Sequence, residues 1–166
     1  MKARRILCAA TTGLAALVVS AVLVAQPASA HSPLTTQVVY AGGTVCVIAR
    51  SQIHANHGNG NLSASAYSTF RVHRGGDCST IDVLPPGHIR VSYDLQKWNG
   101  SAWTFCRGTG WTYNSGAWNW EVGVGNSYGS APCGRGHYRT LAKAMVWDGS
   151  AWQGGSLWSP SHPPVP

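Results

Sequence analysis

The chain has 166 residues, of which only 10% are charged, and it contains twenty glycines and eight tryptophans. Its formal net charge of +7 comes from twelve basic and five acidic residues that form no long basic run, which argues against nucleic-acid binding. With so few charges, solubility must come from Ser, Thr, Asn and Gly, a composition that suits an extracellular β protein.

The first thirty residues predict a secretory signal peptide. Three basic residues precede an uncharged, largely apolar run over residues 6–24, and Ala28 and Ala30 are the small residues expected before a cleavage site. We therefore predict a signal helix over residues 1–30 that lies outside the fold, with cleavage after Ala30. The apolar run is longer than usual for a signal peptide, so an uncleaved membrane anchor is the alternative.

Cleavage leaves residues 31–166, which have nine basic and five acidic residues and a net charge of +4. This length suits one domain with one hydrophobic core. We expect a single secreted β domain over residues 31–158 and a Pro-rich C-terminal tail over residues 159–166, whose four prolines should not continue a sheet. We also expect the mature protein to be extracellular, monomeric and free of membrane association.

Four cysteines remain after cleavage, which predicts two disulfide bonds in an oxidising compartment. They are Cys46, Cys78, Cys106 and Cys133. The sequence alone allows three pairings. We favour Cys46–Cys78 and Cys106–Cys133, because each bond would tie a strand to a nearby loop and close about thirty residues. A zinc site is the alternative, but no two of these cysteines have C-x-x-C spacing.

Alternating apolar and polar residues predict a series of short strands. The clearest covers residues 62–74, where one parity is apolar and the other polar. Further strands are expected over residues 44–51, 81–84, 88–98, 102–107, 117–124 and 136–147, with a last strand ending near Trp158. Within residues 117–124, Trp118 and Trp120 share the apolar parity and are expected in the core.

One hexapeptide occurs twice. Trp98–Trp103 has the sequence W-N-G-S-A-W, and Trp147–Trp152 has the sequence W-D-G-S-A-W. Asn-Gly and Asp-Gly between strands are strong hairpin signals, because both residues tolerate the positive φ of a tight turn. Each copy therefore predicts the tip of a β-hairpin with a tryptophan on either side.

Eight or nine short strands without helical periodicity predict an all-β fold, namely an antiparallel β-sandwich, with a closed barrel as the alternative. Gly136-His137-Tyr138, at the start of a late strand, resembles the tyrosine-bearing penultimate strand of immunoglobulin-like domains. The signal peptide, cysteine spacing and paired hairpins also resemble small secreted actinobacterial proteins of unassigned function. This second resemblance implies a compartment and a fold, and it carries no active site.

Two groups of polar residues are candidates for chemistry. His54 and His57 could ligate zinc or copper, but no acidic residue or cysteine accompanies them, so we expect a solvated loop and neither metal nor cofactor. Arg139, His137 and Glu121 could form a set for RNA cleavage, although such triples arise readily by chance. Because no H-E-x-x-H motif occurs in the sequence, a small secreted hydrolase is the third functional hypothesis.

Aromatic residues are the one enriched class that indicates a function. Trp103, Trp111, Tyr113 and Trp152 lie in or beside turns, where complete burial is difficult. Exposed rings stack on sugars and anchor protein interfaces. The alternative is that these rings cover the ends of the sandwich and stabilise cross-strand pairs. We expect them to form a glycan-binding surface at the turn-rich end, and the low charge favours a neutral polymer.

The sequence therefore favours a non-catalytic extracellular binding module for a glycan or cell-wall polymer. A protein-directed inhibitor or toxin, with another secreted protein as its partner, is the second hypothesis. Its candidate contact is the loop from Asn126 to Cys133, which a disulfide bond would hold.

Overall fold

The computed structural model describes residues 34–56 and 60–165, which form eleven β-strands and, within these ranges, no helix. The predicted signal peptide and His57 lie outside the described residues. None of the described segments is a helix long and apolar enough to span a membrane. The strands are β1 (Leu34–Gly42), β2 (Val45–Asn56), β3 (Asn61–Arg74), β4 (Asp77–Ile81), β5 (Ile89–Trp98), β6 (Trp103–Gly108), β7 (Thr112–Tyr113), β8 (Glu121–Tyr128), β9 (Gly136–Trp147), β10 (Trp152–Trp158) and β11 (His162–Val165).

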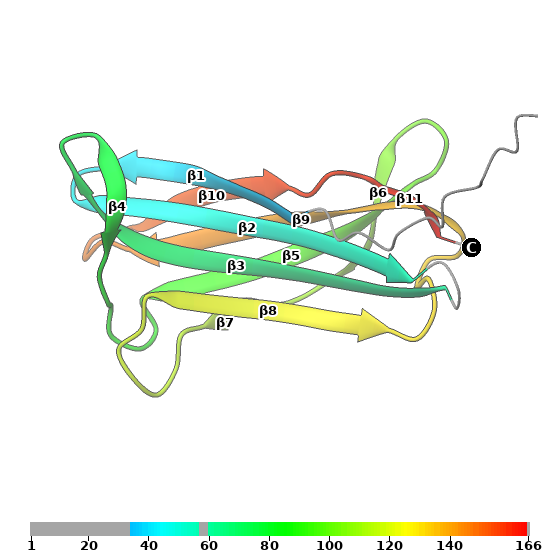
Figure 1. Ribbon diagram of the computed structural model, residues 1–166. Coiled ribbons are helices and arrows are strands. Elements are labelled where there is room, and N and C mark those ends of the chain that lie inside the picture. Colours follow the sequence, from blue (N-terminus) through cyan, green and yellow to red (C-terminus); the bar gives the residue numbers. More distant parts are fainter. Residues whose placement is uncertain (1–33, 57–59, 166) are drawn as a thin grey trace, which may run out of the picture.

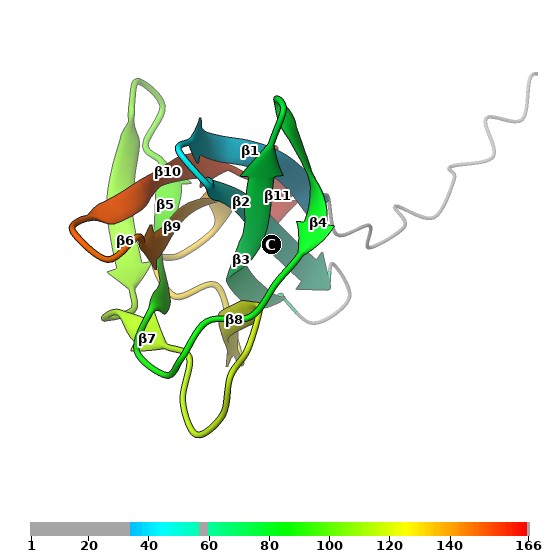
Figure 2. The ribbon, with the colours of Figure 1, turned by 90° about the vertical axis from the view of Figure 1, so that its left-hand side faces the viewer.

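Two antiparallel sheets face each other (Figures 1 and 2). In the first sheet, β1, β2 and β3 lie side by side, and β8 and β4 pair one after the other with the remaining edge of β3. In the second sheet the order is β10, β9, β5 and β6, with β11 also paired to β9 and β7 also paired to β5. The predicted all-β sandwich is confirmed, with eleven strands instead of eight or nine.

The core follows from alternation along the strands, because one face of each sheet is apolar. The parity predicted for β3 is confirmed, since its buried apolar residues are Leu62, Ala64, Ala66, Phe70 and Val72. The facing residues of β5 are Ile89, Val91, Tyr93 and Leu95, all fully buried. Removing these side chains from water is the main stabilising contribution to the fold.

The sequence-based boundaries fail beside β8 and β4. Trp118 and Trp120 were expected in the core, but they are 64% and 37% exposed, because β8 begins only at Glu121 and the alternation does not extend into the preceding loop. The strand expected over residues 81–84 lies earlier, as β4, and leaves an isolated bridge between Leu84 and Asn119.

The Pro-rich tail also differs from the prediction. Residues 162–165 form β11, in which His162 pairs with Tyr138 and Val165 with Gly136 across an irregular register. In the part of the chain that the structure describes, β11 pairs with β9 alone, and prolines are tolerated on such an edge because their missing N–H groups are not needed there. The expectation that this tail does not continue a sheet is therefore wrong.

Both hexapeptides form hairpin tips, as predicted. In each, the N–H of Asn99 or Asp148 donates to the C=O of the alanine three residues later, at 3.1 Å, and the side-chain oxygen accepts two backbone N–H bonds of the turn. Gly100 and Gly149 both have φ of 103°, whereas no described non-glycine residue has positive φ. The turn therefore depends on one left-handed glycine and a polar side-chain cap.

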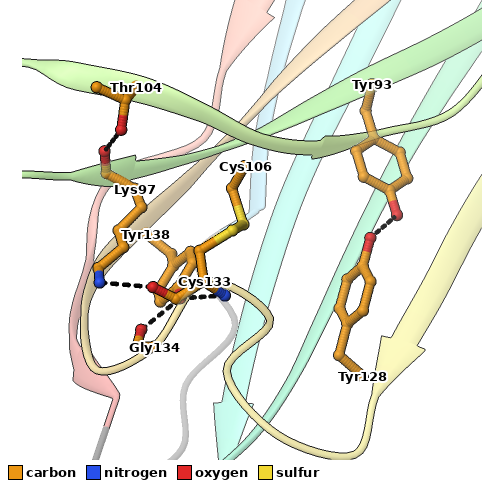
Figure 3. The surroundings of a disulfide bond; sticks show 8 residues. All are labelled: Tyr93, Lys97, Thr104, Cys106, Tyr128, Cys133, Gly134 and Tyr138. Atoms are coloured by element: carbon orange, nitrogen blue, oxygen red, sulfur yellow. Dashed lines mark hydrogen bonds between the residues drawn. A yellow bond between two sulfur atoms is a disulfide. The ribbon is translucent and has the colours of Figure 1, made fainter.

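The disulfides join Cys46 to Cys78 and Cys106 to Cys133, which confirms the favoured pairing. The first links β2 to β4, and the second links β6 to the loop that precedes β9 (Figure 3). Disulfides of this kind are typical of an oxidising environment.

Tyr138 holds the loop that precedes β9. Its hydroxyl donates to the C=O of Gly134 at 2.5 Å and accepts the N–H of Cys133 at 3.1 Å, while Lys97 Nζ donates to the C=O of Cys133 at 2.6 Å (Figure 3). Because β8 continues to Tyr128, the loop predicted from Asn126 to Cys133 is shorter than expected.

Candidate functional site

The outer face of the second sheet is rich in aromatic residues. The alternation that buries one parity of β5 and β9 turns the other parity outward, including Arg90 and Arg139. Six of the eight tryptophans lie on this sheet or beside it. They are Trp98, Trp103, Trp111, Trp147, Trp152 and Trp158. This face therefore holds most of the large rings that the core does not need.

Arg139 gathers rings at one end of the face. Its Cζ lies 4.5 Å from the ring centre of Trp103 and 3.7 Å from that of Trp158, which are cation–π distances. Its Nε and Nη2 donate to Gln96 Oε1 at 3.1 and 2.9 Å. Trp103 also packs on its cross-strand partner Trp98, with ring centres 5.5 Å apart. We call Arg139, Trp98, Trp103 and Trp158 the Arg139 cluster.

Arg90 gathers rings at the other end. Its Cζ lies 4.3 Å from the ring centre of Trp111 and 4.0 Å from that of Trp152, and its Nη2 donates to Met145 Sδ at 3.1 Å. The Trp152 ring also lies 6.0 Å from Tyr113 and 5.7 Å from its cross-strand partner Trp147. We call Arg90, Trp111, Tyr113, Trp147 and Trp152 the Arg90 cluster.

The two clusters belong to an internal repeat that extends beyond the hexapeptide. Arg90 and Arg139 each stand eight residues before the first tryptophan of a hairpin, and Gln96 and Met145 each stand two residues before it. In the antiparallel register of β5 and β9, Arg90 lies opposite Met145 and Arg139 lies opposite Gln96. Each arginine therefore reaches the second tryptophan of the other hairpin, and the hairpin tips lie at opposite ends of the sheet (Figure 1).

The four predicted ligand-binding residues are divided between these clusters. Trp111, Tyr113 and Trp152 belong to the Arg90 cluster and Trp103 to the Arg139 cluster. Arg139 lies opposite Gln96, which is six residues along β5 from Arg90. At about 3.3 Å per strand residue, the two clusters lie about 20 Å apart on one face. The expectation of one turn-rich end is therefore wrong. Sequence reasoning did not place Trp158, Arg90 or Arg139 on a binding face and considered Arg139 only for RNA cleavage, although the equal spacing of the two arginines from the hairpins was a usable signal.

Burial distinguishes inner rings from outer rings. Trp103 and Trp152 are half-buried and packed on cross-strand partners, which agrees with the structural alternative for these two residues. Trp111, Tyr113 and Trp158 are 38%, 43% and 39% exposed. We call Trp103 and Trp152 the inner rings, and Trp111, Tyr113 and Trp158 the outer rings. The inner rings and the arginines thus support the outer rings, which expose part of their surface to solvent.

The centre of the face, between the clusters, is polar. Lys143 Nζ lies 2.6 Å from Asp94 Oδ2, and Ser156 on β10 is exposed. Burial lowers the pKa of the Arg139 guanidinium, which stays charged because arginine is protonated in proteins at any ordinary pH. At the Arg139 end, an open cleft of about 280 Å³ is lined by Trp98, Trp103, His137 and Ser161.

The residues considered for catalysis do not come together. Glu121 lies on the first sheet, where it pairs with Arg50 and accepts a hydrogen bond from Thr69 Oγ1 at 2.8 Å. Arg139 and His137 lie on β9 of the second sheet, so the predicted triple is not assembled. Among the described residues, no group of three or more His, Cys, Asp or Glu side chains could hold a metal ion.

His54 lines a polar groove on the outer face of the first sheet. This groove has a volume of about 370 Å³, and its other lining residues are Gln52, Ser63, Ala64, Ser65, Gly125, Asn126 and Ser127. Small residues on β3 and β8 leave this space open. The groove holds no aromatic ring, and its shape and lining differ from those of the aromatic face.

No protein-family model, curated protein or solved structure significantly matches the chain.

Proposed function

We propose that the protein is a secreted, non-catalytic binding module for an extracellular glycan or cell-wall polymer, and that the outer face of the second sheet binds this ligand. The observation that carries the proposal is the pair of arginine-centred ring clusters on one face. Sugars present apolar C–H faces that stack on aromatic rings, and partly exposed tryptophan and tyrosine side chains suit such contacts.

Preorganisation supports this function. Trp103 and Trp152 are each held by a cross-strand ring and by an arginine, so little side-chain freedom remains to be lost on binding. A stacked ring contributes on the order of 1 kcal/mol beyond area burial. Binding of a single sugar would be weak, and a polymer that contacts both clusters would gain affinity from each.

The setting agrees with such a role. Two disulfides are typical of proteins that work in an oxidising compartment, and the sequence of residues 1–30 predicts export. We propose that the secreted protein acts as a monomer without a cofactor.

The test is co-sedimentation of the secreted protein with cellulose, chitin and peptidoglycan. We expect retention on at least one polymer, and weaker retention after Trp111→Ala or Trp152→Ala in variants with unchanged circular dichroism. Absence of retention on all three polymers, together with absence of binding to the soluble glycans tested below, would reject the glycan function and favour the second hypothesis, in which the same rings dock another secreted protein.

A further inference from the structure

We propose that the ligand of this face is an acidic glycan whose negative groups are bound by Arg90 and Arg139. The inference rests on the proposed glycan function and narrows its ligand class. An acidic ligand differs from the neutral polymer that the low overall charge favours. The reason for the difference is that binding depends on where the positive charges lie on the surface and not on the total charge of the protein.

Neither arginine has a carboxylate partner among the described residues. The ion pairs there join Arg50 to Glu121 and Lys143 to Asp94. Arg90 and Arg139 donate instead to a thioether and to an amide oxygen, both neutral. In the described part of the chain, Nη1 of each guanidinium makes no hydrogen bond.

The acidic side chains near the face are already engaged. Asp94 pairs with Lys143, and Asp148 at the hairpin tip accepts bonds from two backbone N–H groups, from the Ser150 hydroxyl and from Gln153 Nε2 at 2.7 Å. Those bonds hold the pKa of Asp148 far below its ordinary value, so its charge is fixed within the turn. Neither carboxylate therefore forms an ion pair with Arg90 or Arg139, and each cluster keeps a guanidinium that can bind an anionic group.

An arginine surrounded by rings suits an acidic sugar. The guanidinium edge offers N–H donors for a carboxylate, sulfate or phosphate oxygen, and charge-assisted bonds of this type are about twice as strong as neutral ones. The neighbouring rings provide apolar area for the sugar itself. One cluster can thus bind both parts of a charged sugar unit.

The spacing of the charges favours a sparsely charged polymer over a nucleic acid. Along the axis of a DNA duplex each strand carries a phosphate about every 3.4 Å, so about six phosphates of one strand would cover the distance between the clusters. Over that length the face offers two arginines that have no carboxylate partner among the described residues, with the Lys143–Asp94 ion pair between them. A polysaccharide with a charge every few units matches this spacing better.

The experiment compares pairs of polymers that share a backbone, one member acidic and the other neutral. The secreted protein is titrated with partly methyl-esterified polygalacturonate and its full methyl ester, and with sparsely substituted carboxymethyl cellulose and hydroxyethyl cellulose. We expect at least one acidic member to bind tenfold more tightly than its neutral twin. The difference should shrink between about 0.01 M and about 0.15 M salt, because the screening length falls from about 30 Å to about 8 Å.

Variants assign the charge effect to the clusters. Arg90→Gln with Arg139→Gln should lower affinity for the acidic polymer at least tenfold more than affinity for its neutral twin, whereas Arg74→Gln, on the exposed end of β3, should change neither. Equal binding of acidic and neutral twins would overturn the acidic ligand and leave the glycan function standing. Binding to neither member of any pair would overturn both, and tighter binding to polyuridylate than to every acidic glycan would replace the glycan by a nucleic acid.

Discussion

Arg90 and Arg139 lie on neighbouring antiparallel strands, and each guanidinium contacts the second tryptophan of the hairpin formed by the other strand. Arg90 on β5 contacts Trp152, and Arg139 on β9 contacts Trp103. At each end of the face, the position of the tryptophan therefore depends on the hairpin turn after one strand and on an arginine of the neighbouring strand. The two hairpin tips are thus structural determinants of the binding face.

The glycine of each tip should be sensitive to substitution. Gly100→Val or Gly149→Val should reduce the free energy of unfolding by about 1–2 kcal/mol, because a β-branched residue resists the φ of 103° found at both positions. Chemical denaturation measures the loss. Gly110→Val is the matched control, since Gly110 has no positive φ and a Cβ there would meet no atom within 4 Å. Equal stability of all three variants would show that the tips do not need a left-handed glycine.

Both disulfides should be present in the exported protein. Its intact mass should be lower than that of the reduced chain by the two hydrogens lost at each of two bonds, and its sequence should begin at His31. Replacing Cys106 and Cys133 together by serine should cost about 3 kcal/mol of stability, because the bond joins two residues that are 27 positions apart in the chain and so restricts the unfolded state. Free thiols in the secreted product would contradict the pairing.

Tyr93 joins β5 to β8 through its buried hydroxyl. The hydroxyl lies 2.9 Å from Tyr128 Oη (Figure 3). It also accepts a bond from Asn126 Nδ2 at 2.8 Å. Tyr93→Phe should cost about 1–2 kcal/mol, since a partner inside the protein loses its hydrogen bond. Differential scanning calorimetry at neutral pH measures the cost, and an unchanged melting temperature would contradict it.

The same side chain should make stability fall at alkaline pH. Burial, followed by the hydrogen bond to Tyr128, raises the pKa of Tyr93 above its ordinary value, so folding favours the neutral form. This contribution is fully present below about pH 10, the pKa of an unfolded tyrosine, and is lost as pH rises above that value. The alkaline decline should be shallower in Tyr93→Phe. A residual decline is expected from Tyr138, whose pKa burial also raises.

Local pattern was sufficient for the strands that alternate between a buried and a wet face. Leu62 to Val72 could be assigned to the core because period-two alternation is a local property of a strand. The same rule failed at Trp118 and Trp120, because alternation has meaning only where the backbone is extended and paired, and β8 starts after both residues. Nothing local marks that start.

The site required information that one strand does not contain. The hexapeptides predicted two hairpins, but only the pairing of β5 with β9 determines that their tips lie at opposite ends of the sheet. The same pairing brings Arg90 to Trp152, which is 62 residues later in the chain. Long-range register of this type is set by the whole hydrophobic pattern and the turns together.

The central claim is that the outer rings of both clusters bind a glycan. The most direct measurement is the affinity of the secreted protein, with Trp111→Ala and Trp158→Ala combined, for whichever polymer retains the unmodified protein. One ring on the order of 1 kcal/mol from each cluster predicts a loss of about tenfold or more, with no change in circular dichroism. Trp118→Ala, which removes the more exposed tryptophan of the loop before β8, should keep full affinity. Unchanged affinity in the double variant, or an equal loss in Trp118→Ala, would contradict the claim.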